Sequence, residues 1–505
     1  MASIAVNMKF ITLLASVAAA QVQTSPIRPS HDSAKANANH IFNAIHSAGR
    51  QWGSSLNHNG FGFIPVVVPA GTLLYHGGYF EDPPDRFEWL AFEVEHAENF
   101  VRVPNRGRVG CGDEQPHPPS SDQKLLGQPE TGPGDCEEGR VRGYLQTYQT
   151  TRDVRLLYLD GTSAGKSPMG TLDSQDEVLC PSNDSDRGFG GEMYRAKCLC
   201  DLVTEWGWDG IMRMEIGFEA IYCNFSAGLH LDSSVRTIIP EERLKPDGYM
   251  ITYLWSRAAA ERYDDIGGDR VQMDFSSMIS GFFFPINVSN TDPDRPDLIR
   301  LGAAKREHLK DIKTYIQSAV EEPKKFNVNW QAVVDMIITR FSKRLAAMAS
   351  TNVSTDLFIG ELEGAIMTYL EAPRLPGDIT VAEDDDGKNR TAEAVDRCAS
   401  HYLKPALLSQ KDWTLSDSLI HTALGVASPD VEADAYFIKR DVKKDLAWTT
   451  WKKPQLCDVD QILLTAMWPF GDSVDHFNPG CVSVQNVTAR RRNYWTPHER
   501  RPFTY

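Results

Sequence analysis

The most regular stretch of this 505-residue chain runs Ile211-Met212-Arg213-Met214-Glu215-Ile216-Gly217-Phe218-Glu219-Ala220-Ile221-Tyr222. Interpreted as one β-strand, it has apolar side chains at its even positions, whereas Arg213, Glu215 and Glu219 share the other face. Two carboxylates four residues apart would then lie on one face, with Gly217 between them. Two interpretations stay open: a half-buried antiparallel strand with a solvated charged face, and a strand that carries catalytic carboxylates.

Strand-like segments also dominate the chain before this stretch, from about residue 61. They are short runs of β-branched or aromatic residues between turn formers: Phe63–Val68, Leu73–Tyr75, Trp89–Phe92, Gly143–Thr150 and Val154–Leu159. The interval from Pro104 to Gly143 is dense in Pro, Gly, Asp and Glu, and we expect it to be loop. A helix is expected over Ala36–Gly49, where apolar residues fall at helical spacing and the final glycine ends the pattern.

Helical periodicity replaces the strand pattern beyond about residue 245. Apolar residues recur in three stripes: Leu309, Ile312, Ile316 and Val320; Trp330, Val334, Ile337, Phe341 and Leu345; and Leu357, Leu362, Ile366 and Leu370. The sequence therefore predicts an α+β protein. A strand-rich, disulfide-stapled N-terminal domain over residues 21–240 would precede a mainly α-helical C-terminal domain over 241–485, and residues 486–505 would form a basic tail.

The first twenty residues have the features of a secretory signal peptide. Lys9 supplies a positive charge, and Phe10–Ala20 is a mostly apolar run that ends in small residues, so cleavage before Gln21 is expected. This run is too short to cross a bilayer, which takes about 20 apolar residues, and no other stretch is long and apolar enough. We therefore expect a secreted, extracellular protein without a membrane span.

Glycosylation signals and net charge agree with this location. Asn-x-Ser/Thr sequons, which mark surface loops of secreted proteins, occur at Asn183, Asn224, Asn287, Asn352, Asn389 and Asn486. The formal net charge of −16 disfavours nucleic-acid binding, because such proteins need a basic surface. An extracellular protein or a cell-surface target is the kind of partner that we expect.

Nine cysteines in a secreted chain predict disulfides rather than a metal site. Cys111 and Cys136 bracket the loop interval, and Cys457 and Cys481 bracket another. A bridge across a loop of this size stabilises by roughly 3.5 kcal/mol. The one-residue spacing of Cys198 and Cys200 does not suit zinc. We expect no metal site elsewhere, and we interpret the neighbouring residues Asp472, Asp475 and His476 as an exposed loop.

An earlier strand-like segment, Leu73-Leu74-Tyr75-His76-Gly77-Gly78, ends in a histidine and two glycines, which would let a ligand reach the backbone as well as the imidazole. Trp89-Leu90-Ala91-Phe92 follows, and then a short helical stretch to Phe100. In this order, and with Glu219 on a later strand, residues 70–225 resemble the ADP-ribosyltransferases of the histidine-first kind. In its secretory features the chain also resembles secreted glycoproteins of filamentous fungi.

The resemblance implies roles for individual residues and makes NAD a co-substrate. His76 would bind the NAD ribose beside Gly77. Either Phe92 or Phe100 would stack on nicotinamide. Glu219 would stabilise an oxocarbenium-like transition state, as in an ADP-ribosyltransferase or an NAD glycohydrolase. The pattern departs from the family in two places, because no tyrosine stands at the stacking position and a glycine stands where some subfamilies have Gln or Glu two residues before the catalytic glutamate.

Two other functions stay open. The stretch Gly161-Thr162-Ser163-Ala164-Gly165 has the Gly-x-Ser-x-Gly form of a serine hydrolase, in which Ser163 would be the nucleophile and His76-Gly77-Gly78 would resemble an oxyanion loop. A nucleophile elbow must lead into a helix, and Lys166–Gly170 is a poor helix start. The remaining alternative is a non-catalytic glycoprotein that uses the N-terminal fold for binding.

Overall fold

A computed structural model describes residues 25–102, 105–109, 137–141, 143–181, 191–237, 266–267, 270–321, 328–373, 375, 377, 389–427, 446–452, 457–483 and 494–495. The expected signal peptide, Cys111, Cys136, Asn183, Asn486 and the basic tail apart from residues 494–495 lie outside the described residues. No helix within these described ranges is long and apolar enough to cross a membrane.

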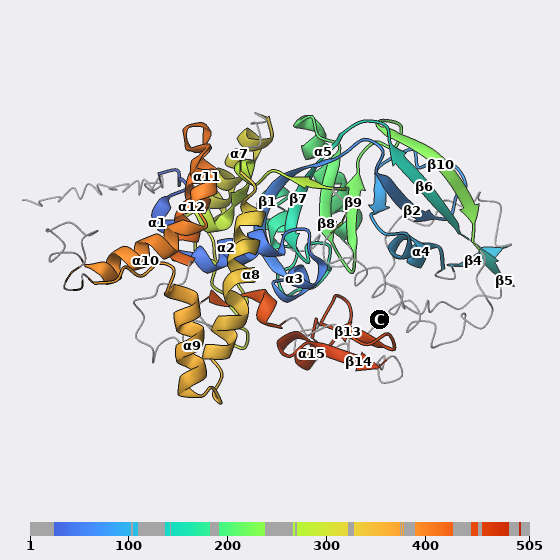
Figure 1. Ribbon diagram of the computed structural model, residues 1–505. Helices are drawn as coiled ribbons and strands as arrows, with labels where there is room; N and C mark the ends of the chain where they lie inside the picture. The colour runs from blue at the N-terminus through green and yellow to red at the C-terminus, as the bar shows by residue number, and fades with distance from the viewer. Residues whose placement is uncertain are drawn as a thin grey trace, which may run out of the picture.

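A ten-stranded mixed sheet is the main feature of the described chain (Figure 1). Its strand order is β10-β6-β2-β3-β9-β8-β7-β1-β11, and β12 also pairs with β1. The strands are β1 Asn59–Val68, β2 Leu73–Gly78, β3 Glu88–Ala91, β6 Tyr144–Thr150, β7 Val154–Gly161, β8 Gly210–Met214, β9 Phe218–Tyr222, β10 Leu229–Arg236, β11 Gln272–Met273 and β12 Ile279–Ser280. Among these strands, β7 and β8 run parallel and the other pairs run antiparallel. The expected α+β class is confirmed.

The stretch Ile211–Tyr222 folds as a β-hairpin and not as the single strand that its alternation predicted. Arg213 pairs with Glu219 and Met214 with Phe218, and the N–H of Glu215 donates to the carbonyl of Gly217 at 3.0 Å to close the turn. Because paired residues are an even number of positions apart, the alternation continues through the turn and hides it. Every residue of β8 and β9 is buried, so the interpretation with a solvated charged face is wrong.

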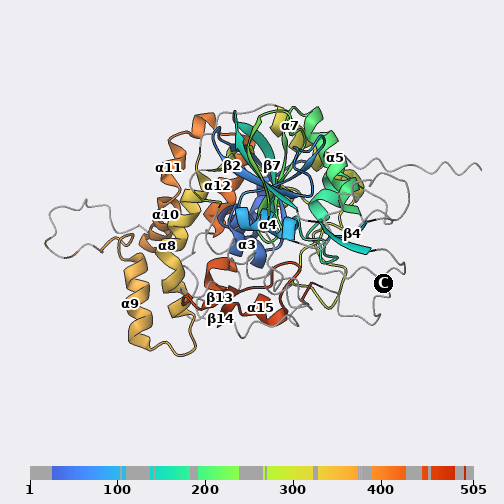
Figure 2. The ribbon, with the colours of Figure 1, turned by 90° about the vertical axis from the view of Figure 1, so that its right-hand side faces the viewer.

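Helices lie on both sides of the sheet and form a separate group beside it (Figures 1 and 2). The α-helices are α1 His31–Ala36, α2 Ala38–Ser47, α3 Gln51–Leu56, α4 Val94–Arg102, α5 Glu192–Glu205, α7 Arg306–Glu321, α8 Trp330–Met348, α9 Thr355–Ile366, α10 Arg390–His401, α11 Lys404–Leu407, α12 Leu415–Ala427 and α15 Ser473–Phe477. A π-helix, η1, covers Ser174–Leu179, and 3-10 helices cover Phe275–Ser277, Gly281–Phe283, Gln410–Asp412 and Thr449–Lys452.

The expected helix over Ala36–Gly49 is confirmed as α2, and the first two apolar stripes are confirmed as the buried faces of α7 and α8. The third stripe is confirmed only in part, because Leu362 and Ile366 are partly buried against the core but the other two residues are not. Leu357 is 50% exposed and Leu370 44% exposed, whereas Phe358 and Ala365 are the buried residues of α9. This helix lies at the edge of the helical group, where α8 covers one side of it and its other side faces outward (Figure 1).

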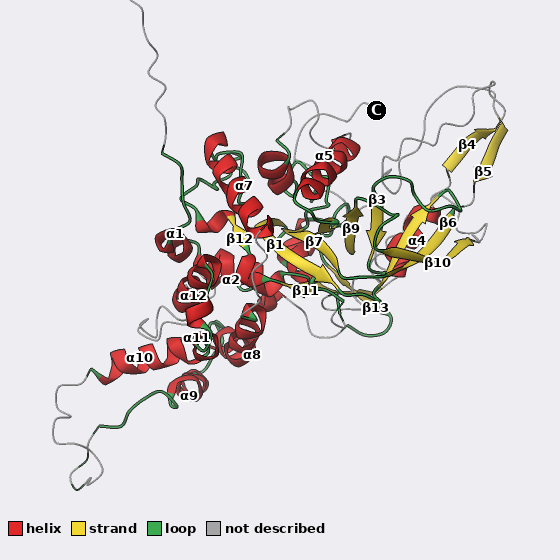
Figure 3. Cartoon of the chain, turned by 90° about the horizontal axis from the view of Figure 1, so that it is seen from above, coloured by secondary structure: helices red, strands yellow, loops and turns green. Residues whose placement is uncertain are grey.

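The sheet and the helices contribute residues to one hydrophobic core. Strands β11 and β12, which follow residue 241, pair with β1, and Phe42 of α2 stacks on Trp448 with ring centroids 5.1 Å apart. Trp208 donates from Nε1 to the carbonyl of Val320 in α7. Seen from above, the sheet extends outward from this helical group (Figure 3).

Two further hairpins lie outside the main sheet. One is β4 (Asn105–Val109) with β5 (Glu137–Val141), so the interval expected to be loop contains two strands. The other is β13 (Gln461–Leu464) with β14 (Gly480–Ser483), where Cys457 is bonded to Cys481 as the loop suggested.

The prediction that the chain contains disulfides is confirmed, although two of the pairings were not predicted from the sequence. In the described chain, Cys180 is bonded to Cys198 and Cys200 to Cys223, so the neighbouring cysteines of α5 hold disulfides and no metal. Cys398 is a buried free thiol. The four described sequon asparagines are exposed at the surface: Asn224, Asn287, Asn352 and Asn389.

Candidate functional site

The β8–β9 hairpin places charged side chains on one face of the sheet, away from solvent. Arg213 and Glu219 are cross-strand neighbours, and Nε of Arg213 donates to Oε1 of Glu219 at 3.0 Å. The exposed fractions of these side chains are 0% and 2%. Glu215 lies in the turn of the same hairpin and is also buried. Charged groups rarely lie this deep without partners, because removing them from water costs several kcal/mol each.

Helix α5 and the π-helix η1 supply partners on one side of Arg213. Nη1 of Arg213 donates to Oε1 of Gln175, and Nη2 donates to Oε1 of Glu192 in the first turn of α5. Arg195 donates to the second oxygen of Glu192 at 2.7 Å. It also binds Asp176 through two hydrogen bonds of 2.7 and 2.9 Å. Burial alone lowers the pKa of Arg213, but the carboxylates of Glu192 and Glu219 outweigh this and raise that pKa.

Lys166 supplies a partner at the other end of the site. It lies in the segment after β7, which is held against β8 by the N–H of Ala164 donating to the carbonyl of Met214 at 2.8 Å. Nζ of Lys166 donates to Oε1 of Glu215 at 2.9 Å. Burial alone would raise the pKa of Glu215, but Lys166 and the neighbouring His96 outweigh it and lower that pKa to about 2. Glu215 is therefore a carboxylate at neutral pH.

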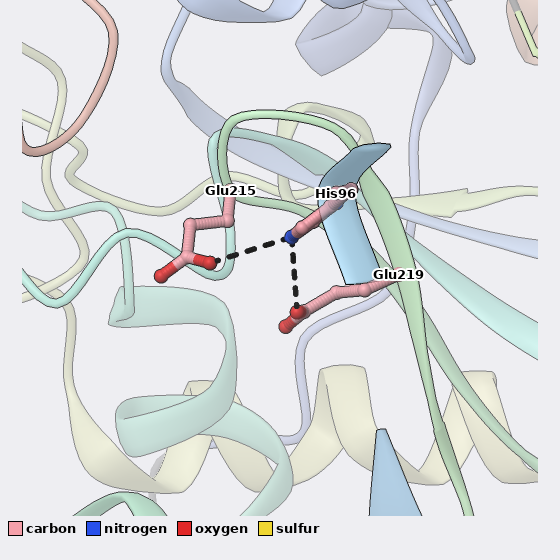
Figure 4. A group of neighbouring side chains, drawn as sticks. All are labelled: His96, Glu215 and Glu219. Carbon is pink, nitrogen blue, oxygen red and sulfur yellow. Dashed lines mark ion pairs between the residues drawn. The ribbon is translucent and has the colours of Figure 1, made fainter. Parts of the chain in front are cut away.

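His96 of α4 completes the site, and sequence reasoning did not find it. Its Nε2 lies 3.7 Å from Oε2 of Glu215 and 4.0 Å from Oε2 of Glu219, with the imidazole pointing between the two carboxylates (Figure 4). The side chain is 3% exposed, and neither ring nitrogen has a hydrogen-bond partner among the described residues. A β-carbon at Gly217 would come within 2.8 Å of Nδ1, so this glycine makes room for the imidazole.

These side chains form a chain of contacts in which acidic and basic groups alternate. We call it the charge row, and its members in order are Lys166, Glu215, His96, Glu219, Arg213, Glu192, Arg195 and Asp176. Among these described side chains, four carboxylates face three permanent cations, so the row carries one negative charge in excess while His96 is neutral. Buried ionisable groups held together in this way are common at functional sites.

Two residues assigned by resemblance lie beside the charge row. Gly77 of β2 has no side chain, and a β-carbon there would meet the carbonyl of Ala97 and approach Cβ of Phe100 at 3.2 Å. The ring of Phe100 in turn lies 5.7 Å from that of His96, centroid to centroid. Gly77, Phe100, His96 and Glu219 therefore lie next to one another in this order, and Phe100 and His96 both belong to α4. Phe100 is partly exposed, whereas Glu219 lies deep.

His76 is not brought together with Glu219. The register places Tyr75, Ala91 and Glu219 in one row across β2, β3 and β9, so the preceding and following positions point to the opposite face. His76 is on that opposite face, where its ring packs 5.8 Å from that of Phe225 and its Nδ1 donates to the carbonyl of Trp89. Burial lowers the pKa of His76.

Phe92 is a core residue in the structure. It is 1% exposed, its N–H donates to the carbonyl of Phe218, and its own carbonyl accepts from Arg270. Of the two aromatic residues proposed for stacking, Phe100 is therefore the one whose side chain is partly exposed.

Ser163 has a structural environment that differs from a nucleophile elbow. It is 1% exposed, and its hydroxyl donates to the carbonyl of Leu159 at 2.7 Å, while its own carbonyl accepts from Gln175. The chain continues through turns before η1 begins at Ser174. No histidine is paired with this hydroxyl within the described residues.

The interpretation of Asp472, Asp475 and His476 as an exposed loop is wrong. Oδ1 of Asp472 accepts from the N–H of Asp475, and Oδ2 of Asp475 accepts from the N–H of Asp472, which is a capping box at the start of α15. His476 is 5% exposed and stacks on Tyr494 at 4.4 Å. The carboxylates therefore satisfy helix N–H groups.

The comparisons with known proteins match the part of the chain that holds the site. A family model described as the YPL277C N-terminal domain matches residues 30–253, which include every member of the charge row. Two proteins of Saccharomyces cerevisiae (strain ATCC 204508 / S288c), uncharacterized protein YPL277C and uncharacterized protein YOR389W, are 33% and 34% identical to this chain over 232 residues. The match covers 42% of this chain and 45% and 35% of theirs, so the chain spans less than half the length of these curated relatives. No solved structure matches the chain.

Proposed function

We propose that the protein is an extracellular NAD-cleaving enzyme of the ADP-ribosyltransferase type, with Glu219 as the catalytic carboxylate. The observation that carries the proposal is that Gly77, Phe100 and Glu219 lie on one side of the sheet, in the order that the resemblance requires. They come from β2, from the helix that follows β3, and from β9, and these three strands are neighbours in the sheet. Disulfides support an oxidising, extracellular compartment.

Phe100 and Glu219 suit the two ends of the bond that would break. A flat nicotinamide ring packs well on the partly exposed ring of Phe100, because aromatic pairs gain from offset stacking. The ribose would then lie toward His96 and Glu219, whose side chains are buried. Arg213 holds Oε1 of Glu219, which orients this carboxylate and favours its ionised form.

The charge balance of the site matches the reaction. The bond between C1′ of the ribose and the nicotinamide nitrogen breaks, its electron pair goes to that nitrogen, and neutral nicotinamide leaves. A positive charge then develops on the ribosyl group, and the carboxylate of Glu219 stabilises it at low dielectric. Water or an acceptor nucleophile adds to C1′ and releases a proton. The four carboxylates of the charge row, which face three permanent cations, favour this cation.

His76 has no part in this proposal, although the resemblance gave it the ribose. It lies on the opposite face of the sheet, and its hydrogen bond to the carbonyl of Trp89 ties β2 to β3. It therefore acts here as a supporting residue of the strand that carries Gly77.

The test is release of nicotinamide from NAD by the full-length protein secreted from a eukaryotic host, measured by chromatography. Glu219→Gln keeps the size of the side chain but removes its charge, so turnover should fall by on the order of 10²-fold or more. The matched control is Glu88→Gln, the same change on the neighbouring strand β3 but on the opposite face, and it should leave turnover within about twofold.

Thermal unfolding of both variants shows whether each is folded. The proposal fails if folded wild-type protein releases no nicotinamide above the blank. It also fails if the two variants lose turnover equally, because the loss would then not depend on the face that carries Glu219.

A further inference from the structure

We propose that His96, Glu215 and Glu219 form a binding site for a divalent cation of the zinc class. Each of the three offers a ligand atom, and these atoms all lie within 4.8 Å of one another. The imidazole comes from α4 and the carboxylates from the two ends of the β8–β9 turn (Figure 4). The site is thus built from elements that the fold already holds together.

The state of His96 is the independent observation that points to a ligand. Its side chain is 97% buried, and neither nitrogen has a hydrogen-bond partner among the described residues, although Nε2 points between two carboxylates. An unsatisfied buried polar group costs about 1–3 kcal/mol, so native proteins rarely leave one without a function. A neutral imidazole is the commonest metal ligand in proteins, and bonding to a cation would satisfy Nε2.

The spacing suits a small cation. Nε2 lies 3.7 and 4.0 Å from the nearest oxygens of Glu215 and Glu219. Atoms at such separations surround a central point at roughly 2.5 Å, and an inward shift of a few tenths of an ångström gives zinc bonds of about 2.0–2.2 Å. Rotation of the side chains of His96, Glu215 and Glu219 would have to supply this shift.

Partners outside the three ligands orient the carboxylates. Lys166 binds Oε1 of Glu215 and Arg213 binds Oε1 of Glu219, so in each case it is Oε2 that faces His96. Such outer contacts fix ligand geometry in known metal sites. One imidazole and two carboxylate oxygens are a donor set that zinc accepts, and three protein ligands leave a coordination position open.

Charge limits how tightly the cation is held. The charge row has one negative charge in excess while His96 is neutral, so a dication would reverse its sign to one positive charge. An anionic ligand in the open position would neutralise that charge. The same oxygen of Glu219 that would bind the cation faces the proposed ribose position, so zinc and NAD should compete. The metal site itself does not depend on NAD chemistry.

The experiment is metal binding by the full-length glycosylated protein, stripped with EDTA and dialysed against zinc. Elemental analysis should find one zinc per chain that the wild type retains. His96→Gln should weaken zinc binding by at least 100-fold in a chelator competition, because it removes one of three ligands. His230→Gln is the matched control: it changes a histidine that is 67% exposed and lies 3.7 Å from Asp232, and it should leave zinc affinity unchanged.

X-ray absorption at the zinc edge keeps the proposal testable even if His96→Gln does not fold. The wild type should show one imidazole nitrogen and two carboxylate oxygens around the metal. A wild type that retains no zinc, zinc held by sulfur, or a His96→Gln protein with unchanged affinity would each overturn the site. Nicotinamide release by the metal-free wild type tests the proposed function separately, because that activity needs no zinc.

Discussion

Gly217 lies so close to His96 that a β-carbon on it would come within 2.8 Å of the imidazole Nδ1. Gly217→Ala should therefore push the His96 ring away from Glu215 and Glu219. Overpacking of this kind costs about 1–3 kcal/mol, which thermal or denaturant unfolding measures. Gly302→Ala, where a β-carbon meets no atom within 4 Å, is the control and should change stability little. Equal stability of the two variants would contradict the close approach.

Asp160 predicts a dependence of stability on pH. It is buried at the end of β7, where Oδ1 accepts from the N–H of Gly62, and burial raises its pKa from the ordinary value of 3.8 to about 7. Between these values the folded protein keeps a proton that the unfolded chain releases, so the free energy of unfolding falls as pH rises from about 4 to about 7.

Asp160→Asn removes this titration and should flatten the stability curve between pH 4 and 7. Above pH 7 the variant should be more stable than the wild type, by up to roughly 4 kcal/mol from a shift of about three units. Denaturant unfolding at several pH values measures the difference. Asp232→Asn, a change at an exposed position, is the control. A curve for Asp160→Asn that is as steep as that of the wild type would argue against a protonated Asp160.

Two disulfides close loops of similar length, so replacing each in turn separates an effect on stability from an effect on the geometry of the site. Cys200–Cys223 joins α5 to the end of β9 and closes a loop of 23 residues, and Cys457–Cys481 closes one of 24 residues beside β13 and β14. Replacing either pair with serine should lower the free energy of unfolding by about 3 kcal/mol. Only the first pair should also weaken zinc binding, because α5 carries Glu192 and Arg195. Equal effects of the two replacements on zinc binding would count against that role of α5.

The hydrogen bonds of His58 define its tautomer and give another test. Asn59 uses Nδ2 to donate to the carbonyls of Met169 and Ile299, so its Oδ1 must accept from Nδ1–H of His58. Nε2 of His58 therefore accepts from the hydroxyl of Tyr494 at 2.8 Å. Tyr494→Phe would leave that buried nitrogen unsatisfied and should cost about 1–3 kcal/mol in unfolding experiments.

Tyr194→Phe serves as the control for this change, because Tyr194 is 53% exposed on α5. It should unfold like the wild type. A Tyr494→Phe protein as stable as this control would show that the hydroxyl contributes nothing to the anchoring of the C-terminal segment.

The expected extracellular location of the protein is tested by its N-terminal residue and by its glycans. Protein collected from the medium of a secreting eukaryotic host should begin at or near Gln21 and lose mass on endoglycosidase treatment. Asn224, Asn287, Asn352 and Asn389 are exposed and open to modification. N-terminal sequencing of secreted protein gives the answer, and an intact Met1 retained inside cells would contradict the prediction.

Local patterns predicted most of the elements, because a strand or a helix face leaves its period in the sequence. The strands that contain Phe63–Val68 and Val154–Leu159 and the buried stripe of α7 follow directly from such periods. The hairpin within Ile211–Tyr222 did not, because its turn preserves the alternation of both strands. The exposure of Leu357 could not be predicted either, since it depends on how many helices surround α9.

Half of the candidate site could be predicted from sequence. Glu219, Gly77 and Phe100 stand in recognisable motifs, and the structure brings them to one face. His96 stands in none, and its one signal is that it shares the buried side of α4 with Ala97 and Val101. Contacts across long distances in sequence, such as that of Lys166 with Glu215, leave no periodic trace at all.

The alternation of acidic and basic side chains along the charge row has a consequence for the evolution of this protein. Each inner member of the row touches two members of opposite character. The loss of Arg213 alone would remove one counter-charge from both Glu219 and Glu192 in a place that water does not reach, although His96 would remain beside Glu219 and Arg195 beside Glu192. Single replacements would therefore destabilise the fold, and we expect a lineage to leave this arrangement through paired replacements. Among related proteins we expect the row to be inherited whole or to be absent whole.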